Sequence, residues 1–167
     1  MIVFSDYRQT RTSHSIYGNL HDYIPFYFAP RSPMLYAIYQ GKVERYANSQ
    51  NQIIYVITRT DKILQAGLDY VFTDGHAVIG FSEFYKDFEY LDKIDWSVMK
   101  TRYWFDTEDD PDRKRRRQAE FLVYKIVPVK VFSGFAVKSK KMKNKVEQIL
   151  RKYNINKPVA IREQWYY

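Results

Sequence analysis

The feature that most constrains the fold is a series of short runs rich in aromatic and β-branched residues, most of them three to six residues long. Short runs of this composition, bounded by turn residues, are typical of β-strands. Strands are predicted over residues 23–28, 53–58, 70–72, 119–124, 134–137 and 158–167. Together they predict an α+β fold with a mostly antiparallel sheet and a few helices.

Helices are predicted between these runs from their start and stop signals. The Ser-Pro pair at residues 32–33 has the order of an N-cap and a first helical residue, and Gly41 ends that segment. Thr60 and Asp95 are N-cap candidates for two short helices, and an amphipathic helix is predicted over residues 141–153. The predicted buried stripe of this last helix is Val146, Ile149, Leu150 and Tyr153.

Composition excludes several classes of protein. With 167 residues and no cysteine, the chain is expected to form one domain without a disulfide scaffold, a thiol nucleophile or a thiolate metal site. No apolar run approaches the ~20 residues of a membrane span, and the first residues lack the apolar stretch of a signal peptide. We therefore expect a cytoplasmic protein without a membrane partner.

The net charge of +8 is distributed unevenly. Residues 83–112 hold 4 basic and 10 acidic side chains, whereas residues 113–167 hold 16 basic and 3 acidic ones. A basic surface with many aromatic rings suits a single-stranded nucleic acid, because phosphates attract cations and bases stack on rings. The alternative is a basic face that serves only solubility.

A long irregular segment from residue 73 to 112 carries most of the acids, and long loops in compact domains are usually functional. Five carboxylates near its end could hold a magnesium ion for a nuclease, or could pair with the basic run at 113–117. They are Asp106, Glu108, Asp109, Asp110 and Asp112. The chain has neither a P-loop nor a G-x-G-x-x-G motif.

Glu120 is the strongest candidate for a catalytic carboxylate. It lies where five consecutive basic residues give way to an apolar run and alternates with Phe121 and Val123, so it is expected half buried at the entrance of a strand. A carboxylate fixed there can stabilise the oxocarbenium-like transition state that forms when a glycosidic bond breaks. The alternative is that Glu120 only pairs with Arg115 or Arg117.

Five segments, in order along the chain, carry a resemblance to a known family. They are LHDYIPFYFAPRSPMLYAIYQGKV (20–43), YVFTDGHA (70–77), LDKIDWSVMKTRYW (91–104), DDPDRKRRRQAEFLVYKIVP (109–128) and WYY (165–167). In these segments the chain resembles the DarT toxins, which are DNA ADP-ribosyltransferases of bacterial toxin–antitoxin pairs.

The resemblance implies an ADP-ribosyltransferase fold that cleaves nicotinamide from NAD without a metal. It places ADP-ribose on a nucleobase, typically thymidine, in single-stranded DNA, and so blocks replication. The catalytic glutamate of the family's QAE motif corresponds to Glu120. An arginine that contacts NAD and assists proton removal corresponds to Arg8, with Arg11 as the alternative, and Tyr27 is a further NAD-binding candidate. The implied partner is a macrodomain antitoxin, and the protein is expected to be a monomer.

Residues from about 76 to 120 correspond to the loop that presents the acceptor base. The implied DNA-binding residues are Arg31, Met34, Tyr36, His76, Trp104, Arg113 and Arg115, although Met34 could equally be a helix-packing residue. The family usually begins with a further strand and helix that carry an NAD-binding histidine, and neither His14 nor His21 matches it. The chain is thus expected to be a single domain, 1–167, that is short at its N-terminus. A non-catalytic single-strand binding module and a metal-dependent nuclease remain the alternatives.

Overall fold

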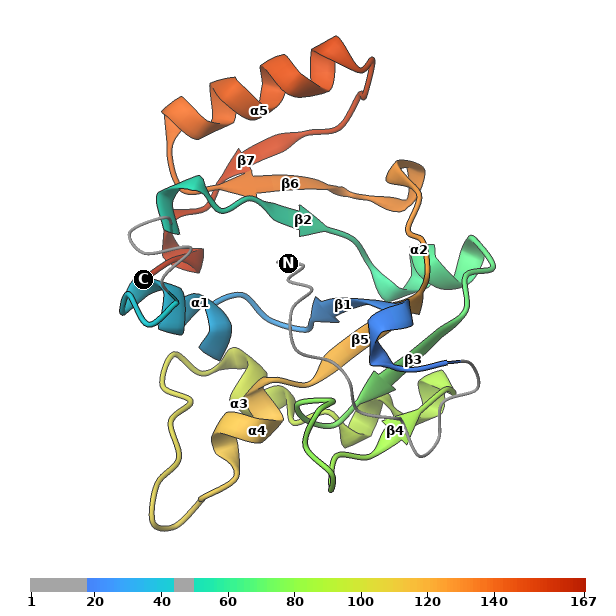
Figure 1. Cartoon of the computed structure of the whole chain (residues 1–167), viewed down its shortest axis with the longest axis vertical. Helices are drawn as coiled ribbons and strands as arrows, with labels where there is room; N and C mark the ends of the chain where they lie inside the picture. The colour runs from blue at the N-terminus through green and yellow to red at the C-terminus, as the bar shows by residue number, and fades with distance from the viewer. Residues whose placement is uncertain (1–17, 44–49) are drawn as a thin grey trace. The chain divides into compact units, whose positions relative to one another are not determined.

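The computed structural model describes residues 18–43 and 50–167, which are coloured in Figure 1. The chain divides into two compact units, each built from segments that are distant in sequence. The first unit comprises Pro33–Gly67 and Pro128–Tyr167, and the second comprises the described residues from Gly18 to Ser32 together with Leu68–Val127. Each unit has its own β-sheet. The assignment of residues 1–167 to one domain stays a prediction.

The second unit contains a four-stranded antiparallel sheet in the order β1-β5-β3-β4. Its strands are β1 (Tyr23–Tyr27), β3 (Tyr70–Thr73), β4 (Phe84–Tyr85) and β5 (Glu120–Tyr124). Pro25 lies opposite Leu122, and β1 is an edge strand of this sheet, where a proline without an N–H donor is tolerated. The central strand β5 is held by ladders on both sides, which fixes the residue at its start.

The two faces of β5 are both covered, which explains its nearly continuous apolar sequence. On one face the ring of Phe121 stacks on Tyr70 with centroids 4.9 Å apart, and it also lies parallel to Phe72 at 6.2 Å. On the other face Leu122 is fully buried with Leu20 and Val71. Alternate residues of a strand point to opposite faces, so each face receives its own apolar contacts.

Two short helices and two 3-10 segments complete the second unit. One 3-10 segment, Leu20–Asp22, precedes β1, and the other, Phe88–Lys93, is followed by α3 (Trp96–Lys100) and α4 (Arg113–Arg117). Asp95 caps α3 with its side chain, which confirms the prediction. Helix α4 was not predicted, because five consecutive cations contain no apolar periodicity that would indicate a helix.

The first unit contains a three-stranded sheet in the order β2-β6-β7. Strand β2 (Tyr55–Ile57) is antiparallel to β6 (Gly134–Val137), and β6 is parallel to β7 (Val159–Ile161). Helix α5 (Lys140–Lys152) connects the parallel pair, as such a crossover requires. The strands other than β4 correspond to predicted runs. Of the four pairings among them, three are antiparallel and one is parallel, so the predicted mostly antiparallel α+β class is confirmed.

The remaining helices of the first unit are α1 (Pro33–Tyr39) and α2 (Thr60–Gln65). Gly41 follows α1 with φ 68°, a left-handed conformation that favours glycine. Thr60 was predicted as the N-cap of α2 but is its first residue, and Arg59 occupies the cap position. None of the helices in the described part of the chain is long and apolar enough to span a membrane.

Two further predictions for the first unit are wrong. The last strand ends at Ile161 rather than at residue 167, because side chains rather than a ladder hold the C-terminal residues: Tyr166 donates its hydroxyl to the Ile53 carbonyl at 2.9 Å. In α5 only Val146 and Leu150 of the predicted stripe are buried, whereas Ile149 is 45% and Tyr153 is 63% exposed.

Candidate active site

Glu120 is the first residue of β5 and lies opposite Tyr27 of β1. Its position at the entrance of a strand was predicted, but the expected half-burial is wrong because the side chain is fully buried. A turn that follows β3 covers it, and the backbone N–H of Ala77 donates to Oε2 of Glu120 at 3.1 Å. The carboxylate is therefore fixed in a low-dielectric surrounding by a backbone donor.

The same turn also holds the backbone of Glu120. The hydroxyl of Thr73 accepts the N–H of Glu120 at 3.1 Å and donates to the carbonyl of Gly75 at 2.6 Å. Thr73 is itself fully buried at the end of β3. The turn from Thr73 to Ala77 thus forms hydrogen bonds with both the main chain and the carboxylate of Glu120, so the strand end and the side chain are both ordered.

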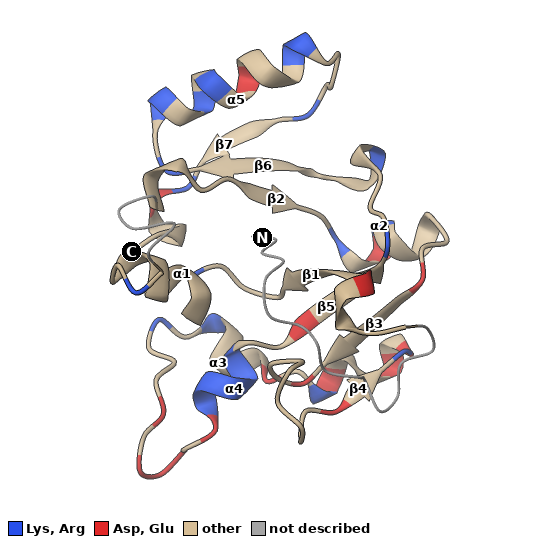
Figure 2. Ribbon diagram, viewed as in Figure 1, with Lys and Arg blue, Asp and Glu red and all other residues tan. Residues whose placement is uncertain are grey.

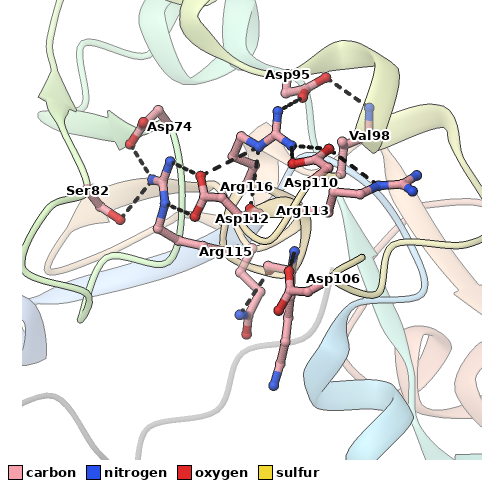
Figure 3. A network of polar contacts seen from close by, with 12 residues as sticks. Asp74, Ser82, Asp95, Val98, Asp106, Asp110, Asp112, Arg113, Arg115 and Arg116 are labelled. Carbon is pink, nitrogen blue, oxygen red and sulfur yellow. Dashed lines mark hydrogen bonds and ion pairs between the residues drawn. The ribbon is translucent and has the colours of Figure 1, made fainter. Parts of the chain in front are cut away.

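Arg115 packs against Gly75 of this turn and belongs to the polar network drawn in Figure 3. Its guanidinium forms a bidentate pair with Asp112, with Nε–Oδ1 and Nη2–Oδ2 distances of 2.7 and 2.8 Å. It also donates to Asp74 at 3.0 Å and to the hydroxyl of Ser82 at 3.2 Å, and it lies 5.1 Å from the Phe81 ring centroid. The hydrogen bond from Arg115 lowers the pKa of Asp112, although partial burial opposes the shift.

Arg116 joins α4 to the start of α3. It donates to Oδ2 of Asp95 at 2.6 Å and to both carboxylate oxygens of Asp110. The other oxygen of Asp95 accepts the N–H groups of Ser97 and Val98, both at 3.0 Å. Burial alone would raise the pKa of Asp95, but the hydrogen bond from the Ser97 hydroxyl, these N–H groups and the charge of Arg116 lower it overall. One carboxylate therefore caps α3 and anchors α4.

Arg117 joins α4 to the other end of α3. Its guanidinium is buried and donates to the carbonyls of Val98 and Met99, both at 2.6 Å, and to that of Thr101 at 3.3 Å. It also donates to the carbonyl of Pro30 at 2.6 Å. Carbonyls at the end of a helix lack intrahelical partners and carry partial negative charge, so a buried cation satisfies them well.

The basic run and the acidic segment therefore pair with each other, as one of the two sequence interpretations proposed. Figure 2 shows the blue α4 close to red acidic positions of the same unit. Asp106 adds to this pairing, since it accepts the backbone N–H of Lys114 at 2.8 Å. Among residues 18–43 and 50–167, no cluster of three or more carboxylates and histidines has the arrangement of a metal site.

A family model described as ssDNA thymidine ADP-ribosyltransferase, DarT, matches residues 4–167. The chain belongs to the DarT family. A DarT relative from Thermus sp. (strain 2.9), named DNA ADP-ribosyl transferase, is 42% identical over 152 residues, which are 90% of this chain and 71% of the relative.

Two solved structures of Thermus sp. 2.9 DarT are similar to this chain, each with a TM-score of 0.85 and 41% sequence identity. One is in complex with ADP-ribosylated ssDNA and the other with NAD+. The match covers 90% of this chain and 71% and 75% of those chains, respectively. The expected DarT resemblance and the ADP-ribosyltransferase fold are thereby confirmed.

The predicted DNA-binding residues of this DarT chain are distributed over both units. Met34 and Tyr36 are half-buried residues of α1 in the first unit, where the Tyr36 ring lies 5.0 Å from that of Tyr167. Arg31, in the second unit, has φ 60°, a backbone conformation that is costly for a residue other than glycine. Backbone strain of this kind often occurs at functional sites, so Arg31 stays a DNA-binding candidate.

The loop candidates of the second unit differ in exposure. Trp104 is buried and stacks on Phe105 with centroids 4.4 Å apart, so Phe105 presents the exposed ring of this pair. His76 is half buried, and its backbone N–H donates to the Arg115 carbonyl at 3.1 Å. Arg113 donates to the Tyr103 carbonyl at 2.9 Å. Their contacts with DNA stay predictions.

Arg8 and Arg11, the candidates for the NAD-contacting arginine, lie outside the described residues, as does His14. Sequence reasoning missed Thr73 and Ala77, which hold Glu120 from a position more than 40 residues upstream. The signal that could have found them is the segment 70–77, which is one of the five that carry the family resemblance.

Proposed function

We propose that this chain transfers ADP-ribose from NAD to thymine in single-stranded DNA, with Glu120 as the catalytic carboxylate. The observation that carries the proposal is the fully buried Glu120, held by the N–H of Ala77 at the start of the central strand of a DarT-family fold. Relatives support the substrates, because Thermus sp. 2.9 DarT has been solved with NAD+ and with ADP-ribosylated ssDNA.

The chemistry follows from the charge that develops during transfer. The bond between nicotinamide and the ribose anomeric carbon breaks, and the bonding pair leaves with neutral nicotinamide. The ribose then carries positive charge, which a carboxylate in a low-dielectric surrounding stabilises strongly. A nitrogen of the base forms the new bond to the anomeric carbon and loses its proton. Glu120 supplies the carboxylate, and its backbone anchors keep it in place without reorganisation.

The other site residues complete the proposal. Tyr27 lies opposite Glu120 across the β1–β5 ladder, which supports its assignment to NAD. Arg8 contacts NAD and accepts or relays the proton of the base, with Arg11 as the alternative. The DNA contacts are those named above apart from Arg115, and an unpaired strand is the favoured substrate because no base has to be unstacked from a duplex.

The test is mass spectrometry of oligonucleotides incubated with the protein and NAD. We expect an ADP-ribose adduct on a single-stranded oligonucleotide that contains thymine, and none on a matched strand without thymine. Glu120→Gln should abolish the adduct, whereas Glu163→Gln, a change at an exposed carboxylate, should not. Oligonucleotide binding without an adduct or NAD consumption would support the non-catalytic binding module instead.

The proposed partner is a macrodomain antitoxin that removes the modification. Family membership supports this partner. The adduct purified from the first experiment is incubated with a macrodomain protein of such a pair, and loss of the ADP-ribose mass is expected. An adduct that persists under conditions where the macrodomain hydrolyses another ADP-ribosylated nucleic acid would contradict the proposal. Size-exclusion chromatography of the isolated chain tests the expected monomer.

A further inference from the structure

Gly75 lies directly under the side chain of Arg115. A Cβ atom at residue 75 would be 2.2 Å from Nη1 and 2.9 Å from Cγ of Arg115. The residue is not among the glycines with positive φ, so its backbone conformation is open to alanine. A Cβ at this position would therefore force the side chain of Arg115 to shift, although the backbone itself would not be strained.

The turn under Arg115 is the one that holds Glu120. Arg115 fixes the outer side of the turn, because its guanidinium binds Asp74 and its carbonyl accepts the N–H of His76. Thr73 and Ala77 fix the inner side, since they bind the backbone and the carboxylate of Glu120. The five-residue turn from 73 to 77 is thus clamped between Arg115 and Glu120.

We propose that Arg115 is a positioning residue, which places the Glu120 carboxylate by packing on Gly75 and holding the turn between Thr73 and Ala77. The inference rests on the proposed function. The bidentate pair with Asp112 keeps Arg115 itself in one orientation, with a side chain that is only 12% exposed. Catalytic groups must be held within about 0.5 Å of their working geometry, and such precision requires a fixed supporting layer.

This role differs in its consequences from the phosphate contact that the sequence predicts for Arg115. Loss of a phosphate contact weakens DNA binding and reduces the slope of log affinity against log salt concentration by about one. Loss of a positioning residue lowers kcat, since a displacement of about 1 Å can cost about 10²-fold, and leaves the KM for the oligonucleotide and its salt dependence nearly unchanged.

The decisive experiment is a double-mutant cycle with Gly75→Ala and Arg115→Ala. We expect each single variant to lower kcat for oligonucleotide modification by about 10- to 100-fold. In the Arg115→Ala background the new methyl group meets no arginine, so Gly75→Ala should have no further effect. Multiplicative losses, or an Arg115→Ala variant that keeps kcat but raises KM and flattens the salt dependence, would overturn the proposal.

A second pair of variants tests the inner side of the turn and serves if Arg115→Ala does not fold. Thr73→Ser keeps the bridging hydroxyl and should retain kcat, whereas Thr73→Val removes it and should lose at least about 10-fold. Thr58→Val is the matched control, because Thr58 donates to the Val131 carbonyl at 2.7 Å in the first unit, outside this network. Equal kcat for Thr73→Ser and Thr73→Val would contradict the inference.

The wild-type chain is assayed first, so that failure of the positioning role can be distinguished from failure of the proposed function. An active wild type with unaffected variants at positions 73, 75 and 115 would refute the positioning role alone. A wild type that consumes no NAD with a thymine-containing strand would refute the proposed function, and the positioning role with it.

Discussion

Replacing Arg117 by methionine should destabilise the protein more than any other single change in the basic run. Arg117 is 4% exposed and donates to four carbonyls, of which those of Val98, Met99 and Pro30 lie at 2.6 Å. Methionine keeps much of the apolar stem but offers no donor. The carbonyls at the end of α3 then lose their cation and their hydrogen bonds at the same time.

The magnitude follows from these contacts. Hydrogen bonds from a charged donor contribute about 1.5–3 kcal/mol each, and removing the desolvated cation offsets part of their loss. Breaking such a buried network typically costs about 3–5 kcal/mol in the free energy of unfolding. For a chain of this length, that corresponds to a fall in Tm of about 6–20 °C. Arg117→Lys should recover only part of the loss, because one ammonium cannot reach every carbonyl.

Urea unfolding at neutral pH, followed by tryptophan fluorescence, measures this change. Arg59→Met is the matched control, since Arg59 pairs with Asp61 on the surface with a side chain that is 69% exposed. Surface pairs contribute at most about 1 kcal/mol, so the control should unfold almost as the wild type does. A loss below about 1 kcal/mol for Arg117→Met would refute the conclusion that this buried cation holds the end of α3.

Three further predictions concern conditions rather than core contacts. Because the folded-state pKa values of Asp95 and Asp112 are lowered, the stability that these carboxylates contribute is fully present above about pH 4–5 and is lost as pH falls further. In an acid titration followed by circular dichroism, the wild type should therefore unfold at a lower pH than Asp95→Asn. EDTA should leave ADP-ribose transfer unchanged, whereas chelator-sensitive strand cleavage would favour the nuclease alternative. The logarithm of oligonucleotide affinity, measured by fluorescence anisotropy, should fall linearly with the logarithm of the salt concentration. An affinity independent of salt would contradict a basic DNA-binding surface.

The sequence predicts most of the strands because their signals are local, but it misses β4 in the segment expected to be irregular and makes the last strand too long. Strand β5 and its edge neighbour β1 follow from aromatic and β-branched runs. Asp95 is a reliable cap signal because its partners, Ser97 and Val98, are two and three residues away. Interactions of this range depend on the order of residues alone.

The full burial of Glu120 and the binding of Arg117 to backbone carbonyls were beyond sequence reasoning. The N–H that binds the Glu120 carboxylate belongs to Ala77, 43 residues earlier, and Arg117 binds backbone carbonyls that carry no residue-specific signal. Five consecutive cations therefore resemble a phosphate-binding surface, although Arg115 and Arg116 are engaged by carboxylates of the same unit. Tertiary contacts assign each cation its role.

The central claim is that Glu120 stabilises the transition state of ADP-ribose transfer. It is tested most directly by the single-turnover rate constant for modification of a thymine-containing strand at saturating NAD, compared between the wild type and Glu120→Gln. Loss of the carboxylate charge should lower this rate constant at least about 10²-fold, with a Tm close to that of the wild type. A Glu120→Gln variant that transfers ADP-ribose at the wild-type rate would contradict it.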